Sequence, residues 1–263
     1  AAALVGYIYQ TNNNECEFNG VIYPCYDCSD DSKPNAGIDC DNGFTVKSNC
    51  QGAPNGDFNQ SCNYHPVSVI PWHGANNFCE AVGKRLPSEA EWERGANGPG
   101  GPDGLNWNRF AWGNDCPAEF NDPGVLDGCS AESWTPESAK ANCADMDEED
   151  NPDINCNDGF EGTSPVGYYE MGKSVEGLYD MTGNVMEWVA DCWHATYAPE
   201  NGAVPPADGS AWMTDCEPGE ERRVATGGSW LDPGDNLRMA YRGGDLLGAS
   251  DPDVGFRCAH DGP

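Results

Sequence analysis

Residues 71–94 read PWHGANNFCEAVGKRLPSEAEWER and contain two helix signals in close succession. In the first half, apolar side chains recur with a helical period before Gly83, a residue type that is typical of a helix end. These inward-facing side chains are Trp72, Phe78 (or Ala75), Cys79 and Val82. In the second half, Ser88 and Glu91 form the S-x-x-E pattern of a capping box. The stretch therefore predicts two short helices, and the second carries Trp92 into the core.

On either side of these helices the sequence is irregular. AAALVGYIYQ, residues 1–10, is apolar and β-prone and predicts a strand. The rest of residues 1–62 is rich in Asn, Asp, Gly and Cys and predicts disulfide-held loops. With 33 glycines and 20 prolines, the chain predicts a loop-rich α+β fold. We expect residues 1–62 to be a cysteine-rich segment packed on a main domain of residues 63–263.

The charge of the chain excludes two classes of partner. Its 263 residues carry 13 Lys and Arg against 44 Asp and Glu, a formal net charge of −31. Such a surface repels nucleic acid and anionic membranes, and no apolar run reaches the ~18 residues of a membrane span. Crowded carboxylates also repel one another, and divalent cations relieve that repulsion. Calcium binding is therefore one expectation, and a solvated acidic surface is the other.

Fourteen cysteines, an even number, are spread through the chain. This is more than a reducing compartment normally tolerates, so we expect a secreted, extracellular or periplasmic protein. Cys25 and Cys28 form the only C-x-x-C pair in the sequence. A zinc knuckle needs a second pair, so a disulfide is favoured there. The sequence shows no initiator Met and no signal peptide, as expected of a mature or trimmed chain.

Three stretches together carry a family signature. They are residues 65–98, residues 177–193 (GLYDMTGNVMEWVADCW) and residues 227–261, which contain GGSW, YR and VGFRCAHD. In this order and at these separations they resemble the formylglycine-generating enzyme family, also called the sulfatase-modifying factor family. The resemblance implies an irregular fold related to C-type lectins, with disulfides and structural calcium.

The middle stretch suggests a cation site in its own right. Asp180 and Glu187 are seven residues apart around a Gly–Asn turn, which can direct carboxylate and carbonyl oxygens to one point, and hard cations prefer such oxygens. By resemblance, one calcium site comprises the side chains of Asp180 and Glu187 and the carbonyls of Gly183 and Val185. A second comprises the side chains of Asn142 and Asp158 and the carbonyls of Cys143 and Phe160. One or two structural calcium ions are expected. The acidic loop 145–158 alone would be interpreted as a solvated charge run.

The resemblance also pairs Cys79 with Cys258. From proximity in sequence we expect three further disulfides, namely Cys116–Cys129, Cys143–Cys156 and Cys192–Cys216. The remaining six cysteines allow fifteen pairings, none of them favoured. They are Cys16, Cys25, Cys28, Cys40, Cys50 and Cys62.

The family's catalytic position is where this chain departs from the pattern. Enzymes of the family carry two cysteines just after the GGS motif, which hold copper and engage the substrate cysteine. Soft thiolates suit Cu(I). Aligned on that pattern, this chain has Asp232 and Leu237, and no cysteine lies between Cys216 and Cys258. We therefore expect no formylglycine generation and assign no catalytic residue.

Other chemistry has weaker support. His65, His73, His194 and His260 form no metal-ligand pair and are interpreted as structural or surface residues. Arg238 and Arg242 are expected to brace the domain through buried carboxylates. The many acidic residues show no spacing that singles out a glycosidase pair. A retasked enzyme with an unrecognised active site is the alternative hypothesis.

The expected function is that of a secreted, calcium-stabilised module that binds a ligand or forms part of an extracellular assembly. A ligand, protein or glycan, could stack on Trp230 and Tyr241, although core packing is favoured for Trp230. No EPN or QPD triplet is present to hold sugar through calcium. The alternative is self-assembly through a sheet edge. The family domain usually begins with a further strand-rich segment, and we expect this chain to start after it or to be trimmed. The exposed edge would then accept a donor strand such as residues 1–10.

Overall fold

The computed structural model describes residues 65–98, 108–113, 140–143, 158, 160, 162–197, 204–214, 222–232 and 234–261. It also describes the backbone of residues 3–7, 9–10, 15–18 and 21–24. The statements below concern these residues.

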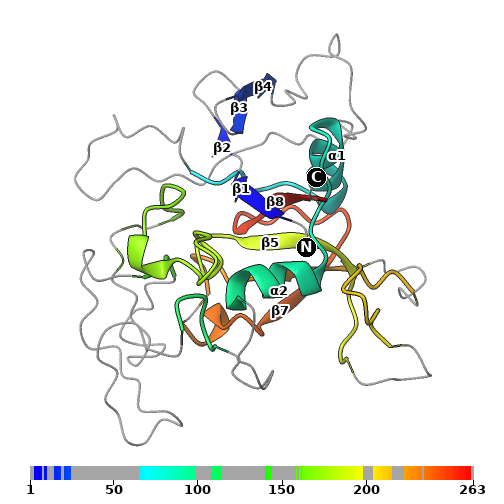
Figure 1. Ribbon diagram of the computed structural model, residues 1–263. Helices are drawn as coiled ribbons and strands as arrows, with labels where there is room; N and C mark the ends of the chain where they lie inside the picture. The colour runs from blue at the N-terminus through cyan, green and yellow to red at the C-terminus, as the bar shows by residue number, and fades with distance from the viewer. Residues whose placement is uncertain are drawn as a thin grey trace, which may run out of the picture.

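A five-stranded sheet forms the centre of the fold (Figure 1). In spatial order its strands are β1 (Ala3–Tyr7), β8 (Val254–His260), β5 (Met186–Cys192), β6 (Arg222–Thr226) and β7 (Arg242–Leu246). β5 and β8 are parallel, and the other neighbouring pairs are antiparallel. A second, three-stranded sheet contains β2 (Tyr9–Gln10), β3 (Glu15–Phe18) and β4 (Val21–Pro24). The fold is a mixed α/β arrangement with a small sheet and few helices.

Both predicted helices are present. α1 (Trp72–Ala81) lies against β8, and α2 (Glu89–Asn97) lies against β5 (Figure 1). α1 buries the predicted face, including Trp72, Phe78 and Cys79. At the start of α2 the Glu91 N–H donates to Ser88 Oγ at 3.1 Å, and the Ser88 N–H donates to Glu91 Oε2 at 2.9 Å. This is the predicted capping box. Two short 3-10 helices, η3 (Glu170–Gly172) and η4 (Gly234–Leu237), follow later in the chain.

Apolar side chains pack on both faces of the sheet, because α1 and α2 contact alternate residues of the same strands. Under α1, Trp188 of β5 and Phe256 of β8 pack with the inner face of the helix. Under α2, Trp92 is fully buried among Met181, Val189 and other apolar residues. A third cluster surrounds Leu237 and contains Phe110, Ala141, Cys143 and Tyr169. These clusters hold the loops before β5 and after β6 in fixed positions.

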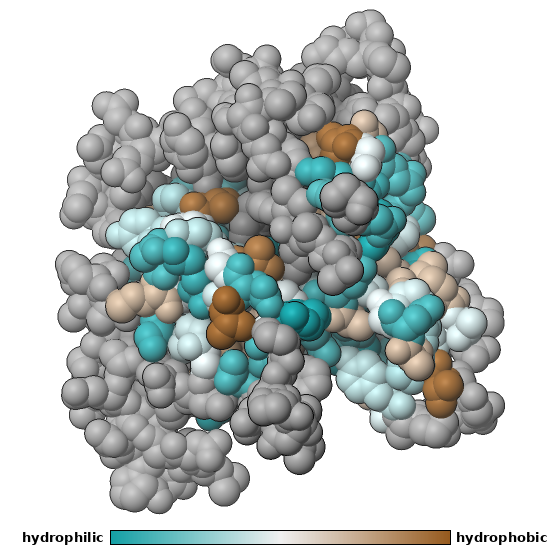
Figure 2. Space-filling model, in the orientation of Figure 1, coloured by the Kyte–Doolittle hydropathy of each residue, from teal (hydrophilic) through white to brown (hydrophobic). Residues whose placement is uncertain are grey.

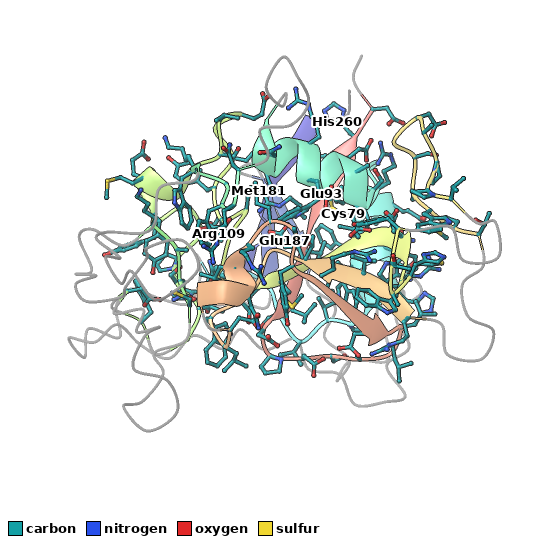
Figure 3. The ribbon with its side chains drawn as sticks, turned by 90° about the horizontal axis from the view of Figure 1, so that it is seen from below. Cys79, Glu93, Arg109, Met181, Glu187 and His260 are labelled. Carbon is teal, nitrogen blue, oxygen red and sulfur yellow. A yellow bond between two sulfur atoms is a disulfide. The ribbon has the colours of Figure 1, made fainter. Side chains whose placement is uncertain are left out.

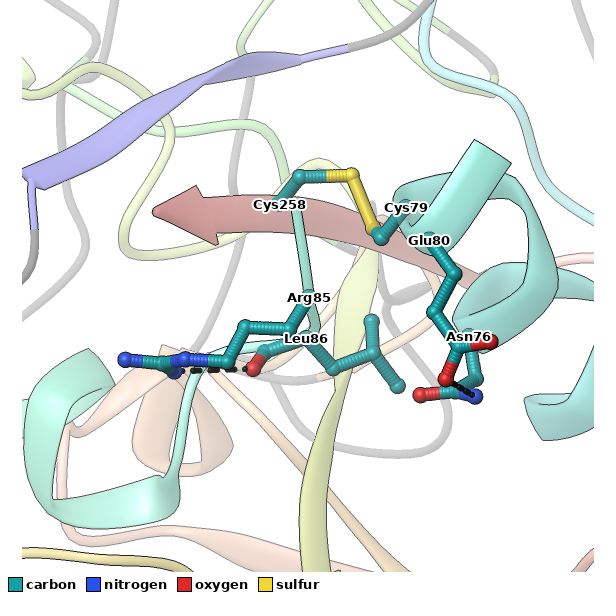
Figure 4. Close-up of a disulfide and its surroundings, with 6 residues drawn as sticks. All are labelled: Asn76, Cys79, Glu80, Arg85, Leu86 and Cys258. Atoms are coloured by element: carbon teal, nitrogen blue, oxygen red, sulfur yellow. Dashed lines mark hydrogen bonds between the residues drawn. A yellow bond between two sulfur atoms is a disulfide. The ribbon is translucent and has the colours of Figure 1, made fainter. Parts of the chain in front are cut away.

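A disulfide joins α1 to the sheet. Cys79 and Cys258 are bonded, as the family resemblance implies, and both are fully buried (Figure 4). Cys143 and Cys192 are also disulfide-bonded, and their partners lie outside the described residues. The pairings Cys143–Cys156 and Cys192–Cys216 therefore remain predictions. Cys116 and Cys129 both lie outside the described residues.

The strand predicted at residues 1–10 forms β1 and β2. β1 pairs with β8 of the same chain, with Ala3 opposite His260 and Val5 opposite Cys258. The predicted donor strand thus covers an edge of its own sheet in this structure. β7 forms the opposite edge.

The outer surface is polar in character. On the face shown in Figure 2, hydrophobic residues are scattered among hydrophilic ones. The larger exposed apolar side chains include Tyr168, Val175, Val204 and Leu231. Within the described ranges, no helix is long and apolar enough to cross a membrane.

Candidate functional site

The GGSW turn follows β6 and is built on two glycines in the left-handed region. Gly227 has a φ of 101° and Gly228 a φ of 69°. A Cβ on Gly228 would lie 2.8 Å from the carbonyl oxygen of Asn236, and one on Gly227 would lie 3.0 Å from the ring of Trp92. Glycine is therefore required sterically at both positions. The turn directs Ser229, which is fully buried, toward two aspartates.

Ser229 bridges two carboxyl groups. Its Oγ lies 2.8 Å from Asp232 Oδ2 and 2.8 Å from Asp253 Oδ2. A hydroxyl has one proton, so it can donate to one carboxylate, and the second contact requires a proton on a carboxyl group. Burial raises the pKa of Asp253, and the nearby charges of Asp232 and Asp245 raise it further. Asp232 is also held through Oδ1, which accepts a 3.0 Å bond from Asn236 Nδ2.

Leu237, at the second position matched to a family cysteine, is a core residue. Its side chain is 1% exposed and packs with Phe110 and Tyr169. A leucine offers no metal ligand. No group of three or more His, Cys, Asp or Glu side chains arranged to hold a metal occurs in the described parts of the chain. The two positions matched to the family's cysteines therefore carry a hydrogen-bonded carboxyl group, at Asp232, and a buried hydrocarbon side chain, at Leu237.

The two aromatic rings proposed as stacking platforms are both partly buried. Tyr241 packs against the apolar cluster under α1. Trp230 has its Nε1 buried without a hydrogen-bond partner. The neighbouring Leu231 is 48% exposed.

The second set of predicted calcium ligands, that of Asn142 and Asp158, is brought together. Asp158, 1% exposed, accepts bonds of 2.8 Å from the N–H groups of both Cys143 and Phe160. Asn142, also 1% exposed, donates through Nδ2 to the carbonyl of Gly162 at 2.9 Å. Its Oδ1 is buried and has no hydrogen-bond partner among the described residues. An orphaned oxygen beside a buried carboxylate fits a hard cation.

Further buried oxygens lie near the Asn142–Asp158 site. Ser164 Oγ and the Tyr169 hydroxyl are buried and form no hydrogen bond within the described residues. Burial raises the pKa of Tyr169, and the charge of Asp158 adds to the rise. These two hydroxyl oxygens and Asn142 Oδ1 are therefore buried oxygen atoms without a hydrogen bond in the described part of the chain.

The Asp180–Glu187 set is arranged differently. Glu187 lies near the centre of the molecule (Figure 3) and is fully buried. Both of its carboxylate oxygens accept bonds from Arg257, and Oε2 also accepts a 2.7 Å bond from Trp92 Nε1. Asp180 Oδ2 accepts a 2.7 Å bond from the Gly167 N–H. A guanidinium ion already bonds to Glu187, so these residues as arranged do not fit a second cation.

The sequence analysis did not identify a role for Arg257 or the partner of Arg242. Arg242 is the predicted brace: its guanidinium bonds to Glu89, with side chains 10% and 6% exposed. It lies 4.7 Å from the centre of the Trp193 ring and 4.4 Å from that of Tyr197. Arg238 is exposed, so it does not form the buried brace expected of it. The sequence motifs contain the arginines, but their spacing does not indicate which carboxylates the arginines bind.

The histidines have structural surroundings. His65 is buried with Nδ1 2.9 Å from Thr163 Oγ1, and burial lowers its pKa to about 4. His194 stacks on Trp212 with ring centres 3.6 Å apart. His73 is exposed on α1.

The sequence from residue 10 to residue 262 matches the family described as Sulfatase-modifying factor enzyme 1-like domain. The chain belongs to the sulfatase-modifying factor family. It is 32% identical to a formylglycine-generating enzyme of Streptomyces coelicolor, over 82% of this chain and 56% of that enzyme. It is 30% identical to the inactive C-alpha-formylglycine-generating enzyme 2 of Mus musculus, over 74% of this chain and 48% of that protein.

Solved structures agree with this family membership. PvdO from Pseudomonas aeruginosa superposes with a TM-score of 0.52 at 26% identity, covering 98% of this chain and 72% of PvdO. The sulfatase-modifying factor family thus includes proteins named as active enzymes and proteins named as inactive. The present chain spans about half the length of the curated formylglycine-generating enzymes it matches.

Proposed function

We propose that this chain is a non-catalytic, calcium-stabilised member of the sulfatase-modifying factor family that acts as a binding or structural module outside the cytoplasm. One observation carries the non-catalytic part: Leu237 is buried in the core where the resemblance places a catalytic cysteine. Cu(I) binding by thiolates has no counterpart at Asp232 and Leu237, because a hard carboxylate and a hydrocarbon do not hold a soft ion.

The calcium part rests on the Asn142–Asp158 site. There the buried Asn142 Oδ1 has no partner, and the buried Asp158 lies between two loop segments that it bonds through their N–H groups. A calcium ion supplies positive charge to both oxygens and links the loops. The C-type-lectin-like character of the fold belongs to the same proposal.

The location and partners follow from the cysteines and the charge. Each cysteine side chain that the structure describes is disulfide-bonded, which supports a secreted, extracellular or periplasmic protein. A net charge of −31 argues against nucleic acid as a partner, which leaves a protein, a glycan or a further copy of the chain. In self-assembly the accepting edge would be one of the two outer strands of the five-stranded sheet, β1 or β7.

The test is a direct assay on a thiol peptide. The purified chain is incubated with a cysteine-containing sulfatase-type peptide, copper and oxygen, and the peptide mass is measured. The Streptomyces coelicolor relative serves as the positive control. We expect no aldehyde and no retained copper. Conversion of cysteine to formylglycine, or one copper per chain, contradicts the proposal.

A second candidate is a retasked enzyme, and the Ser229 bridge is the observation that favours it. Two carboxyl groups that share a proton are a common acid–base arrangement in hydrolases. The candidate predicts an activity that Ser229→Ala reduces by at least tenfold while the fold, followed by circular dichroism, is retained. A panel of ester and glycoside substrates that shows no turnover argues against it.

A further inference from the structure

The guanidinium of Arg257 binds the carboxylate of Glu187, one of the ligands predicted for the Asp180–Glu187 calcium site. Arg257 is 1% exposed, and Glu187, which it pairs with, is fully buried. Nε and Nη2 of Arg257 each donate to a different carboxylate oxygen of Glu187. This is the two-point pairing that arginine makes with carboxylates.

The same guanidinium also binds backbone carbonyls. Nη2 donates to the carbonyl oxygens of Tyr179 at 3.1 Å and Asp180 at 3.2 Å. Arg257 thus gathers one carboxylate and two backbone carbonyl oxygens. Carboxylate and carbonyl oxygens are also the ligands that a calcium ion recruits. The positive charge that these oxygens require is therefore supplied by the Arg257 side chain.

Three features hold the guanidinium in place. Trp92 Nε1 fixes the Glu187 carboxylate from α2 at 2.7 Å. The next residue, Cys258, is anchored to α1 by the disulfide. β5 and β8 pair in parallel with Glu187 opposite Gly255, and a Cβ on Gly255 would lie 2.5 Å from the carbonyl oxygen of Val67. The close packing leaves Arg257 no open route to solvent.

A calcium ion at this place would sit beside a fixed positive charge in a buried, low-dielectric setting. Like charges repel strongly there, and Glu187 would have to give up its bonds to Arg257 to ligate the ion. The Asn142–Asp158 site is different, because Asn142 Oδ1 has no hydrogen-bond partner. The Asn142–Asp158 ligands can therefore accept an added cation more readily than the Asp180–Glu187 ligands.

We infer that this chain binds one calcium ion, at the Asn142–Asp158 site, and that Arg257 permanently takes the place of a calcium ion at the Asp180–Glu187 site. The inference rests on the calcium binding in the proposed function. It also adds a role for Arg257 as an internal counter-ion.

Calcium stoichiometry tests the inference. The full chain is freed of metal, equilibrated with calcium chloride, and its bound calcium is measured by elemental analysis and by calorimetric titration. We expect one ion per chain. Asp158→Asn should lose it, with at least a hundredfold weaker binding, whereas the matched Asp180→Asn should retain it. Two ions per chain, or loss in Asp180→Asn with retention in Asp158→Asn, overturns the inference while calcium binding stands. Zero ions overturns the calcium part of the proposed function.

Replacing the arginine provides the complementary test. Arg257→Met leaves Glu187 buried without a counter-ion, and we expect its calcium content to rise from one to two ions per chain. Arg257→Lys keeps a positive charge and should keep the content at one. A folded Arg257→Met chain that still binds one ion contradicts the inference. If Arg257→Met does not fold, the comparison of Asp158→Asn with Asp180→Asn decides.

Discussion

Cys79 on α1 and Cys258 on β8 are joined by a disulfide across 179 residues of sequence (Figure 4). Two backbone hydrogen bonds reinforce this junction. The Arg85 N–H donates to the carbonyl of Ala259 at 3.0 Å, and the Ala259 N–H donates to the carbonyl of Arg85 at 2.7 Å. The end of α1 and the centre of the sheet therefore form one unit, on which the loops of the candidate sites depend.

Removing this disulfide should destabilise the fold. For a loop of this length the chain-entropy model predicts a loss of about 5 kcal/mol, an upper value because other disulfides shorten the effective loop. The Cys79→Ala/Cys258→Ala variant and the parent are compared by urea unfolding without reductant. A difference below about 1 kcal/mol would show that the bond adds little to the other constraints.

Leu237→Ala should cost about 2–5 kcal/mol of unfolding free energy, because the leucine is 1% exposed in the cluster with Phe110 and Tyr169. Leu231→Ala is the matched control, since that side chain is 48% exposed, and it should change stability by less than about 0.5 kcal/mol. Chemical denaturation measures both. Equal effects in the two variants would contradict the assignment of Leu237 to the core.

Gly244→Ala should disturb the packing around Arg242. A Cβ at this position would lie 2.3 Å from the Trp193 ring, which stacks on that guanidinium. We expect a loss of about 1–3 kcal/mol, as for overpacked sites. At Gly248 a Cβ meets nothing within 4 Å, so Gly248→Ala is the control and should be nearly neutral. Thermal unfolding of the pair tests the contrast, and a neutral Gly244→Ala would rule out this packing.

Stability should fall as pH rises through neutrality, in part because of Glu93 on α2. Burial, together with the charge of Glu89, raises the pKa of Glu93 to about 7, while Arg242 opposes the rise. The folded state thus holds a proton that the unfolded state releases near its ordinary pKa of 4.5. The stabilisation is complete below that value and is lost as pH rises through about 7.

Glu93→Gln isolates this contribution. The variant should match the parent at pH 4 and exceed its unfolding free energy by about 1–3 kcal/mol at pH 8, with calcium held constant. Glu80→Gln, on the exposed side of α1, should show no such difference between the two pH values. Urea unfolding at both pH values provides the measurement. A Glu93→Gln variant that is less stable at pH 8 would reverse the predicted sign.

Sequence reasoning succeeded where the determining contacts are local. The capping box of α2 depends on residues three apart, and α1 ends at Ala81, two residues before the predicted stop at Gly83. The apolar face of α1 follows from its helical period. The Cys79–Cys258 bond came from the family resemblance, because spacing alone does not distinguish among fourteen cysteines.

The site could not be derived in the same way, because its partners are distant. Glu187 and Arg257 are 70 residues apart, and Glu89 and Arg242 are 153 apart. With 44 acidic residues and 13 basic ones, composition offers many equivalent pairs. The parallel register of β5 and β8 selects Glu187 for Arg257, and that register is a property of the folded sheet.

The buried Arg257–Glu187 pair has a consequence for how the domain meets its surroundings. A counter-charge that is translated with the polypeptide requires no uptake from the surroundings and cannot be lost by dilution. If calcium binds as proposed, a change in free calcium leaves the charge balance of β5 and β8 unaltered. Any response to the ion is then confined to the segments that carry Asn142 and Asp158.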